Sequence, residues 1–347
     1  MKTIKIYPCV ENASTQKVRN LLGIKDESVY GWKFELSNEP QYLIVTELIY
    51  YNDDNYKLFR KLAKRYPNAI RIFRTGECVS PDFNMFDYAI VFDRDLRNGD
   101  RVCRIPFNRY FAESLIVSQD TIPYKDKIKG EVKFCNFMYS NANAHPNRDK
   151  LFYSISEYRT VDSIGKHLNN TGIKSTRYNE DWRKISIDLR KPYKFSIASE
   201  NATFRGYVSE KLISCLQAGT IAIYWGDPSI GEDFNTKSFI NCHEYPNFAA
   251  VVERVKEIDQ NDDLWVEIAS SPWQTEEQIE KMRKHDDEYI KFIKNIFDNS
   301  FINAKRRPGG TFTGYYSDWI LSRRTSNKLI LKIKSHFRNK FKSVLKH

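Results

Sequence analysis

The sequence predicts an α/β protein of two domains. Short apolar runs alternate with amphipathic helical segments, and this strand-helix-strand succession is typical of parallel sheets covered by helices. The succession occurs twice, before and after the linker-like stretch 118–129. A length of 347 residues accommodates two packed domains. We therefore expect two α/β domains joined between residues 118 and 130.

The elements of the first half follow from apolar runs and helical periodicity. Leu58, Leu62 and Ala63 fall on one face of a helix expected at 56–65. The expected strands are 3–7, 42–46, 69–73, 88–92 and 102–106.

The same signals predict the elements of the second half. Helices are expected at 149–156 and 207–217. A charged, helical composition predicts a long surface helix between Pro272 and Asn299, part of which can pack back on the first domain. The expected strands are 133–139, 193–197, 221–225 and 239–241.

Composition excludes a disordered chain and locates the basic excess. Hydrophobic residues make up 41% and aromatic residues 14%, which supplies enough apolar surface to offset the entropy cost of folding. The formal net charge is +11, but nine Lys and Arg residues and no acidic residue lie in 323–347. The rest of the chain carries 46 basic and 44 acidic residues. The main body is therefore nearly neutral.

The basic tail has the pattern of an interfacial helix. As a helix, it would place five apolar residues within an arc of about 80°, with most basic residues on the opposite side: Ile330, Ile333, Phe337, Phe341 and Val344. This pattern predicts binding to an anionic membrane surface. A disordered tail and a nucleic-acid-binding tail are alternatives; the second would also need an aromatic groove or a base-contacting motif, and neither is found. We expect no nucleic-acid partner.

The cysteines and the N-terminus indicate a reducing compartment. The six cysteines form no CxxC pair, so buried free thiols are expected. The N-terminus lacks the long apolar run of a secretory signal, and no stretch approaches the roughly 18 apolar residues of a membrane-spanning helix. We expect a cytoplasmic protein, peripheral on the inner face of the membrane.

The segment 193–241 has the densest set of candidate ligand-binding residues. A polar cluster at 199–201 follows an apolar strand, and a loop with Gly206 leads into a helix. In α/β sheets, ligands bind at the carboxyl ends of parallel strands, and helix N-termini favour phosphate. Lys211 would add a positive charge. The alternative is that Glu210 and Lys211 are ordinary exposed residues of a first helical turn.

Several motifs occur in a fixed order within this segment and upstream of it. The segment contains Glu200-Asn201, Gly206-Tyr207-Val208-Ser209-Glu210-Lys211, Gly219, Trp225-Gly226 and Ser238-Phe239-Ile240. Upstream lie TGECVSPDFNMFDYAIVFD, FCNFMYSNANAHPNR and VDSIG. This series resembles the signature of glycosyltransferase family 10, the α-1,3/1,4-fucosyltransferases, and is similar to the bacterial Lewis-antigen enzymes. The resemblance covers roughly residues 70–245, whereas residues 1–65 match only in type.

The motifs depart from the family pattern at two positions. Ser199 stands where the family has an aromatic residue, and Ser209 replaces a threonine but keeps the hydroxyl. The spacer between Asp162 and Tyr193 is long, so its residues are not assigned by the resemblance.

The resemblance implies a GT-B fold, with two Rossmann-like domains facing across a cleft. Residues 1–120 would bind the acceptor and residues 121–300 would bind GDP-fucose, with part of 272–300 packing back on the first domain. Residues 301–322 would form a connector and residues 323–347 the membrane-association tail.

The resemblance also implies which residues bind the donor. Arg148 and Lys211 would hold the pyrophosphate, and Asn201 and Tyr207 would contact the nucleotide sugar. Cations there would stabilise the departing diphosphate in the transition state without a metal. We therefore expect no cofactor, with Mn²⁺ or Mg²⁺ at most stimulatory.

Four further positions complete the implied site. Ser140 and Asn141 would lie beside the donor. Glu77 would be the catalytic base, and Glu210, near the ribose or the fucose, is a second expected catalytic carboxylate. A positioned base contributes about 10²- to 10⁴-fold when it removes the proton of an attacking hydroxyl.

Two other signals are weaker. Asp93-Arg94-Asp95 matches the DxD pattern of metal-dependent glycosyltransferases, but the pattern is short, and a solvated strand end is the favoured interpretation. His243 is expected to have a surface role, and no pair of histidines has zinc-ligand spacing.

The expected function is inverting transfer of L-fucose from GDP-β-L-fucose to the 3-hydroxyl of a GlcNAc or glucose residue. The acceptor would be an N-acetyllactosamine-like oligosaccharide of a surface glycan, such as lipopolysaccharide or a glycosylated protein, and the product an α-1,3-fucoside. A GT-B enzyme with another nucleotide-sugar donor and a nonenzymatic basic binding protein are the alternatives.

Overall fold

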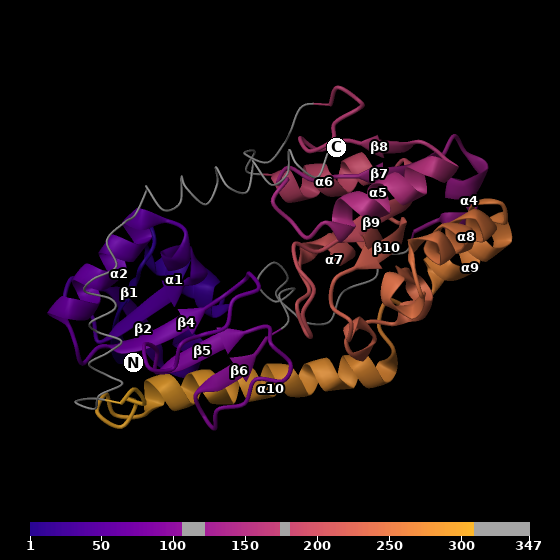
Figure 1. Ribbon diagram of the computed structural model, residues 1–347. Helices are drawn as coiled ribbons and strands as arrows, with labels where there is room; N and C mark the ends of the chain where they lie inside the picture. Colours follow the sequence, from indigo (N-terminus) through magenta and orange to yellow (C-terminus); the bar gives the residue numbers. More distant parts are fainter. Residues whose placement is uncertain (106–121, 174–180, 309–347) are drawn as a thin grey trace. The chain divides into compact units, whose positions relative to one another are not determined.

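The computed structural model describes residues 1–105, 122–173 and 181–308, which form two compact units (Figure 1). Of the described residues, the first unit contains 1–74, 81–89 and 297–308. The second contains 75–80, 90–105, 122–173 and 181–296. Glu77 therefore belongs to the same unit as the other predicted site residues.

The first unit is built on a parallel sheet. Its elements are β1 (Lys2–Pro8), α1 (Thr15–Leu22), the 3₁₀ helices Glu27–Tyr30 and Glu47–Tyr50, β2 (Trp32–Leu36), β3 (Tyr42–Thr46), α2 (Asp53–Arg65), β4 (Ile70–Arg74) and the start of β5 (Tyr88–Val91). The order is β2-β1-β3-β4, followed by β5. β3 and β4 are buried along all five residues, as central parallel strands covered on both faces should be.

The second unit has a parallel sheet in the order β11-β10-β9-β7-β8. These strands are β7 (Lys133–Phe137), β8 (Val161–Ser163), β9 (Tyr193–Ser199), β10 (Ile221–Trp225) and β11 (Ile240–Asn241), and the short β6 (Val102–Arg104) precedes them in the chain. The helices are α4 (Tyr124–Lys129), α5 (Asn147–Tyr158), α6 (Trp182–Arg190), α7 (Glu210–Gln217), α8 (Phe248–Asp259), α9 (Asp262–Ser270) and α10 (Glu276–Asp298), with 3₁₀ helices at Ile230–Glu232, Thr236–Ser238 and Cys242–Glu244.

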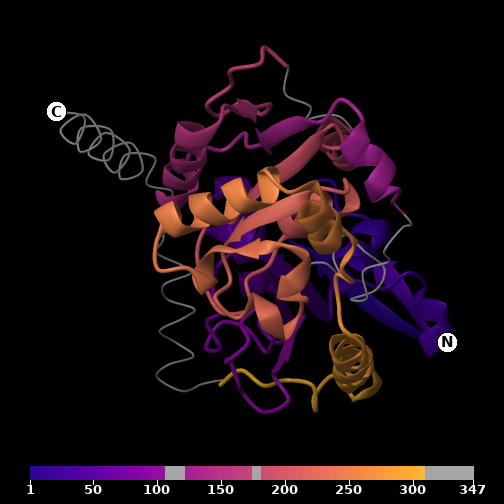
Figure 2. The ribbon, with the colours of Figure 1, turned by 90° about the vertical axis from the view of Figure 1, so that its right-hand side faces the viewer.

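Helices cover both faces of the second sheet. Along β10, Ile221 and Ile223 belong to one apolar cluster, whereas Ala222 and Tyr224 belong to another. Residues of α4, α5, α8 and α9 complete the first cluster, and α7, which contacts α6, completes the second. Figure 1 shows α7 on one side of β10 and α8 and α9 on the other, and Figure 2 shows α8 and α9 in front of the strands. The predicted α/β class is confirmed.

Several predicted bounds are confirmed and others are wrong. The strands expected at 42–46 and 221–225 are β3 and β10. The helix expected from Tyr207 begins only at Glu210, because Ser209 caps it with its side chain. The linker interpretation is wrong for Tyr124–Lys129, which form α4 and contact α9, while residues 118–121 lie outside the described residues.

The predicted tail 323–347 and residues 309–322 of the predicted connector lie outside the described residues. No helix in the described part of the chain is both long enough and apolar enough to cross a membrane. All six cysteines are free thiols; Cys78 and Cys103 are half-buried, and the other four are buried, as expected.

Candidate active site

One pocket of about 450 Å³ brings the predicted site residues together. It lies at the carboxyl ends of β7, β8 and β9, where α/β sheets generally bind ligands, and α6 and α7 form part of its wall. All eight predicted residues line it: Glu77, Ser140, Asn141, Arg148, Asn201, Tyr207, Glu210 and Lys211. The volume is within the usual range for a small-molecule site.

Arg148 is a buried cation in this pocket. It is held by three acceptors: its Nη2 donates to Asn201 Oδ1 at 2.6 Å and to the Ser199 carbonyl at 3.3 Å, and its Nη1 donates to the Asn141 carbonyl at 3.2 Å. The guanidinium also lies 4.1 Å from the centre of the Tyr139 ring. No described carboxylate forms an ion pair with Arg148, and its Nε has no hydrogen-bond partner. Its charge is therefore available to an anionic ligand.

Lys211 is positioned by a buried carboxylate. Its Nζ donates to Glu200 Oε2 at 3.1 Å and to Ser209 Oγ at 2.8 Å. Glu200 is fully buried and also accepts from the backbone N–H and the hydroxyl of Ser209, at 2.7 and 2.6 Å. Burial lowers the pKa of Lys211, but the charges of Glu200 and Glu210 outweigh burial and raise it above its ordinary value. Lys211 therefore stays protonated at neutral pH.

Glu210 stays ionised beside Lys211. Its Oε1 lies 3.7 Å from Lys211 Nζ. Burial raises the pKa of Glu210, but the nearby charge of Lys211, with a further contribution from Arg190, lowers it below its ordinary value. The interpretation of Glu210 and Lys211 as ordinary exposed residues is wrong, because only 22% and 15% of their side chains are exposed and both line the pocket.

Glu77 lies on the segment that follows β4. The Thr75 hydroxyl fixes this turn by accepting from Glu77 N at 3.0 Å and donating to the Glu77 carbonyl at 2.7 Å. The Oε2 atom of Glu77 accepts from the Tyr207 hydroxyl at 3.0 Å and from Asn201 Nδ2 at 3.4 Å. No described residue donates to Oε1. One carboxylate oxygen is therefore held in place, and the other is available to a ligand.

Tyr207 is suited to hold Glu77 as a neutral hydrogen-bond donor. The side chain is buried, and burial together with the charges of Glu200 and Glu77 raises the pKa of its hydroxyl well above the ordinary value. The loop before it passes close to neighbouring backbone at Gly206, where φ is +87° and an added Cβ would lie 2.5 Å from the Phe92 carbonyl oxygen. Only glycine fits there without rearrangement.

Several residues of the pocket were not predicted. Tyr139 supports Arg148, and Trp182, Ser186 and Arg190 of α6 line the wall. The spacing of Ile185 and Leu189 is helical and could indicate α6, but nothing in the local sequence shows that its other face meets α7.

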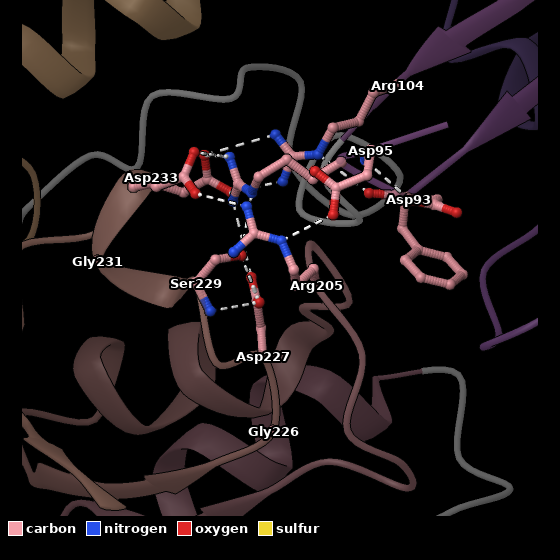
Figure 3. Close-up of polar contacts among 12 residues, drawn as sticks. Asp93, Asp95, Arg104, Arg205, Gly226, Asp227, Ser229, Gly231 and Asp233 are labelled. Atoms are coloured by element: carbon pink, nitrogen blue, oxygen red, sulfur yellow. Dashed lines mark hydrogen bonds and ion pairs between the residues drawn. The ribbon is translucent and has the colours of Figure 1, made fainter. Parts of the chain in front are cut away.

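The DxD alternative is not favoured by the contacts of its carboxylates (Figure 3). Asp93 Oδ1 accepts from the backbone N–H groups of Asp95 and Leu96, at 2.9 and 3.2 Å. Asp95 Oδ2 accepts from Arg205 Nε at 2.7 Å. Both carboxylates therefore have structural partners. Among the residues that the structure describes, no three His, Cys, Asp or Glu side chains are arranged to hold a metal ion.

Arg94, the middle residue of that triplet, belongs to a buried ion-pair cluster. Its Nη2 and the Nη2 of Arg104 each lie 2.6 Å from Asp233 Oδ2. Figure 3 shows Arg104 and Asp233 directed at each other. His243 is also structural: it is exposed, and its Nε2 lies 3.1 Å from the Gly226 carbonyl oxygen.

Two family models match the chain. The model of glycosyltransferase family 10 (fucosyltransferase), C-terminal part, matches residues 128–300. The model of the α-(1,3)-fucosyltransferase FucT N-terminal domain matches residues 31–111.

Two individual fucosyltransferases are also similar to the chain. The chain is 32% identical over 234 residues to the α-(1,3)-fucosyltransferase FucT of Helicobacter pylori, across 58% of this chain and 47% of that protein. It is 25% identical over 242 residues to GDP-fucose protein O-fucosyltransferase 3 of Homo sapiens, across 66% of this chain and 44% of that protein. The chain spans less than half the length of these curated relatives.

A solved structure has the same fold. The crystal structure of an α1,3-fucosyltransferase superposes with a TM-score of 0.68 at 22% identity, over 89% of this chain and 93% of that chain. A second crystal structure, of an α1,3-fucosyltransferase with GDP-fucose, superposes with a TM-score of 0.67.

Proposed function

Because the chain belongs to glycosyltransferase family 10, we propose that it transfers L-fucose from GDP-β-L-fucose, with inversion, to the 3-hydroxyl of a GlcNAc or glucose residue. The acceptor is an N-acetyllactosamine-like oligosaccharide of a surface glycan, and the product is an α-1,3-fucoside. The observation that carries the proposal is the pocket itself, which combines a carboxylate with one available oxygen and two cations. Two relatives support the donor: the Helicobacter pylori protein is an α-(1,3)-fucosyltransferase, and the second crystal structure is that of an α1,3-fucosyltransferase with GDP-fucose.

The residues of the pocket divide the reaction between them. Breaking the bond between fucose C1 and the diphosphate oxygen places negative charge on the leaving GDP. Arg148 and Lys211 stabilise that charge more strongly in the transition state than in the ground state. The acceptor oxygen forms the new bond to C1 from the opposite face of the ring, and its proton passes to Glu77 Oε1.

Glu77 and Arg148 are linked through Asn201. The side-chain carbonyl of Asn201 accepts from Arg148 Nη2, and its amide donates to Glu77 Oε2. A single side chain therefore holds the proposed base and a proposed leaving-group cation at a constant separation. Such preorganisation lowers the cost of reaching the reactive geometry.

Transfer assays on a small acceptor panel test the proposal. A type 2 disaccharide (Galβ1-4GlcNAc) occupies O4 of GlcNAc and leaves the 3-hydroxyl free, whereas a type 1 disaccharide (Galβ1-3GlcNAc) occupies O3 and leaves the 4-hydroxyl free. We expect an α-fucoside at O3 of the type 2 acceptor, identified by linkage analysis and by NMR of the anomeric centre. A β-fucoside, or fucose on type 1 acceptors alone, would contradict inversion or the linkage.

The variant Glu77→Gln tests the base. We expect transfer to fall by about 10²-fold or more, while GDP still binds in calorimetry. Wild-type turnover by this variant would refute the assignment. EDTA treatment, which we expect to leave transfer intact, tests the absence of a metal requirement.

Two other functions are separated by binding experiments. An enzyme with a different donor would hydrolyse or transfer another nucleotide sugar in a donor screen. A nonenzymatic basic binding protein would be stabilised against thermal unfolding by nucleic acid rather than by GDP.

We also propose that residues 323–347 hold the protein on the cytoplasmic face of an anionic membrane, because nine basic residues and no acidic residue occur there.

A further inference from the structure

The loop that leads into Tyr207 lies against the segment that follows β5, and both belong to the second unit. The backbone N–H of Arg94 donates to the Arg205 carbonyl at 3.3 Å. A Cβ added at Gly206 would lie 3.0 Å from the same Arg94 nitrogen, so the two backbones are in close contact. The Phe92 ring packs edge-on against the Tyr207 ring, with 5.0 Å between the ring centres. The segment after β5 therefore fixes both the backbone before Tyr207 and the Tyr207 side chain.

Two arginines hold this segment in place through one carboxylate, that of Asp233 (Figure 3). Arg104 bridges Asp233 and Phe92: its Nη2 donates to Asp233 Oδ2 at 2.6 Å, and its Nε donates to the Phe92 carbonyl at 3.0 Å. Arg94 donates from Nη2 to the same Oδ2 atom at 2.6 Å and from Nε to Ser229 Oγ at 3.0 Å. Burial raises the pKa of Asp233, but the two arginines lower it below its ordinary value, so the carboxylate stays ionised at neutral pH.

This cluster of three charged side chains is buried and lies outside the pocket. Only 8% of the Arg94 side chain, 7% of the Arg104 side chain and 1% of the Asp233 side chain are exposed. None of the three residues lines the pocket. A buried ion cluster contributes little net stability compared with apolar side chains of the same volume, because desolvation offsets the attraction between the charges. Its charged hydrogen bonds are directional, however, and they fix the position of the groups that they join.

A continuous series of contacts leads from Asp233 to the proposed base. Arg104 joins Asp233 to the backbone of Phe92. The Phe92 ring packs on Tyr207, and the Tyr207 hydroxyl donates to Glu77 Oε2 at 3.0 Å. A displacement of Tyr207 would therefore turn the Glu77 carboxylate away from the acceptor hydroxyl.

We propose that Asp233 is a positioning residue for the transfer reaction. Through the two arginines it holds the segment that aligns Tyr207, and Tyr207 in turn orients Glu77. This inference rests on the proposed function, in which Glu77 is the base. Donor binding should not depend on Asp233, because Arg148 and Lys211 are held by other groups.

The variant Asp233→Asn keeps the shape of the side chain and removes its charge. We expect kcat for transfer to the type 2 disaccharide to fall about tenfold or more, because a misplacement of about 1 Å can cost about 10²-fold. GDP affinity in calorimetry should be unchanged. The matched control is Asp188→Asn, which changes an ion pair with Lys191 of the same 2.6 Å length. Because 49% of the Asp188 side chain is exposed and Asp188 does not line the pocket, we expect wild-type kcat.

A double-mutant cycle with Tyr207→Phe shows whether the effect passes through Tyr207. Tyr207→Phe removes the hydroxyl that holds Glu77, so the base is no longer oriented by this contact. We therefore expect Asp233→Asn to lower kcat much less in the Tyr207→Phe background than in the wild type, because residues that act through one another are not additive. A purely structural role would lower kcat by the same factor in both backgrounds, and that result would overturn the proposal.

The variant Arg104→Lys decides the question if Asp233→Asn does not fold. Lysine keeps the positive charge beside Asp233, but its single nitrogen cannot bridge Asp233 and the Phe92 carbonyl as Nη2 and Nε do. We expect Arg104→Lys to fold, to bind GDP as the wild type does, and to lower kcat by about threefold or more.

The outcomes separate this inference from the proposed function. If the wild type transfers fucose and the folded Asp233 or Arg104 variant has wild-type kcat, the positioning role is overturned and the function stands. Equal losses of kcat and GDP affinity would also overturn it, since they would indicate a general disruption of the second unit. Failure of the wild type to transfer fucose would overturn the proposed function and, with it, this inference.

Discussion

Replacing Glu200 with glutamine removes a buried charge that three donors surround. The carboxylate is fully buried and accepts from Ser209 N, from Ser209 Oγ and from Lys211 Nζ. Glutamine keeps one acceptor oxygen, but its amide group must face either the Ser209 N–H or the Lys211 ammonium, donor against donor. Breaking one side of a buried ion pair costs about 3–5 kcal/mol. We expect the free energy of unfolding to fall by that amount.

Urea denaturation of a matched pair of variants measures this cost. The control is Glu253→Gln, which removes the partner of Lys256 at 2.6 Å on the surface of α8. Because 70% of the Glu253 side chain is exposed, we expect a loss below about 1 kcal/mol. Calorimetry on the same variants should show GDP affinity reduced about tenfold or more in Glu200→Gln, since Lys211 loses the group that positions it, and unchanged in Glu253→Gln.

Burial, rather than the distance between the charged atoms, decides how much each of these two ion pairs contributes to stability. The Glu253 pair is shorter than the Glu200 pair, 2.6 against 3.1 Å, yet we expect it to contribute far less. If the two variants lose equal stability, or if Glu200→Gln binds GDP as the wild type does, the role assigned to Glu200 is refuted.

Three further predictions follow from the site and the tail. Gly165→Ala should lower the free energy of unfolding by about 1–3 kcal/mol, because the added Cβ would lie 2.2 Å from the Tyr139 carbonyl oxygen. Gly130→Ala is the control and should be nearly neutral, because the nearest atom to its added Cβ lies at 3.5 Å. Urea unfolding of the two variants measures the difference. The pKa of Glu210 is lowered on folding, so its ionised form stabilises the folded protein above the unfolded pKa of about 4.3. This contribution is lost as pH falls through the folded pKa, so the difference in unfolding free energy between the wild type and Glu210→Gln should shrink at acid pH. A difference that stays constant with pH would contradict the assignment. Deletion of residues 323–347 should abolish sedimentation with anionic liposomes and leave transfer to small acceptors intact; unchanged sedimentation would exclude the tail as the anchor.

Local sequence patterns were sufficient to predict some of the helices and strands but not others. Tyr42–Thr46 and Ile221–Trp225 are apolar throughout, and such runs form central strands because only a sheet covered on both faces buries every side chain. The polar face of α1 and the short β2 at the sheet's end gave no such signal. The start of α7 moved to Glu210 because Ser209, the capping residue, also bonds to Glu200, nine positions earlier.

The candidate site shows the same division. The motifs were sufficient to list the eight residues that line the pocket, because they lie in short segments at strand ends and a helix start. The place of Arg190 in the pocket could not be predicted from the sequence, because it depends on the contact between α6 and α7. The same holds for Asp95, whose partner Arg205 lies 110 residues away.

The sequence by itself determined the α/β class, the family and the chemical types available at the strand ends. The period of the hydrophobic residues and the order of the motifs are properties of the sequence, so they can be recognised without the folded structure. The tertiary structure decided which polar groups are paired and which are left over: Glu200 with Lys211, one oxygen of Glu77 with Tyr207, and the unpartnered Nε of Arg190. Pairing depends on distance and burial between residues far apart in the chain, and only folding sets those.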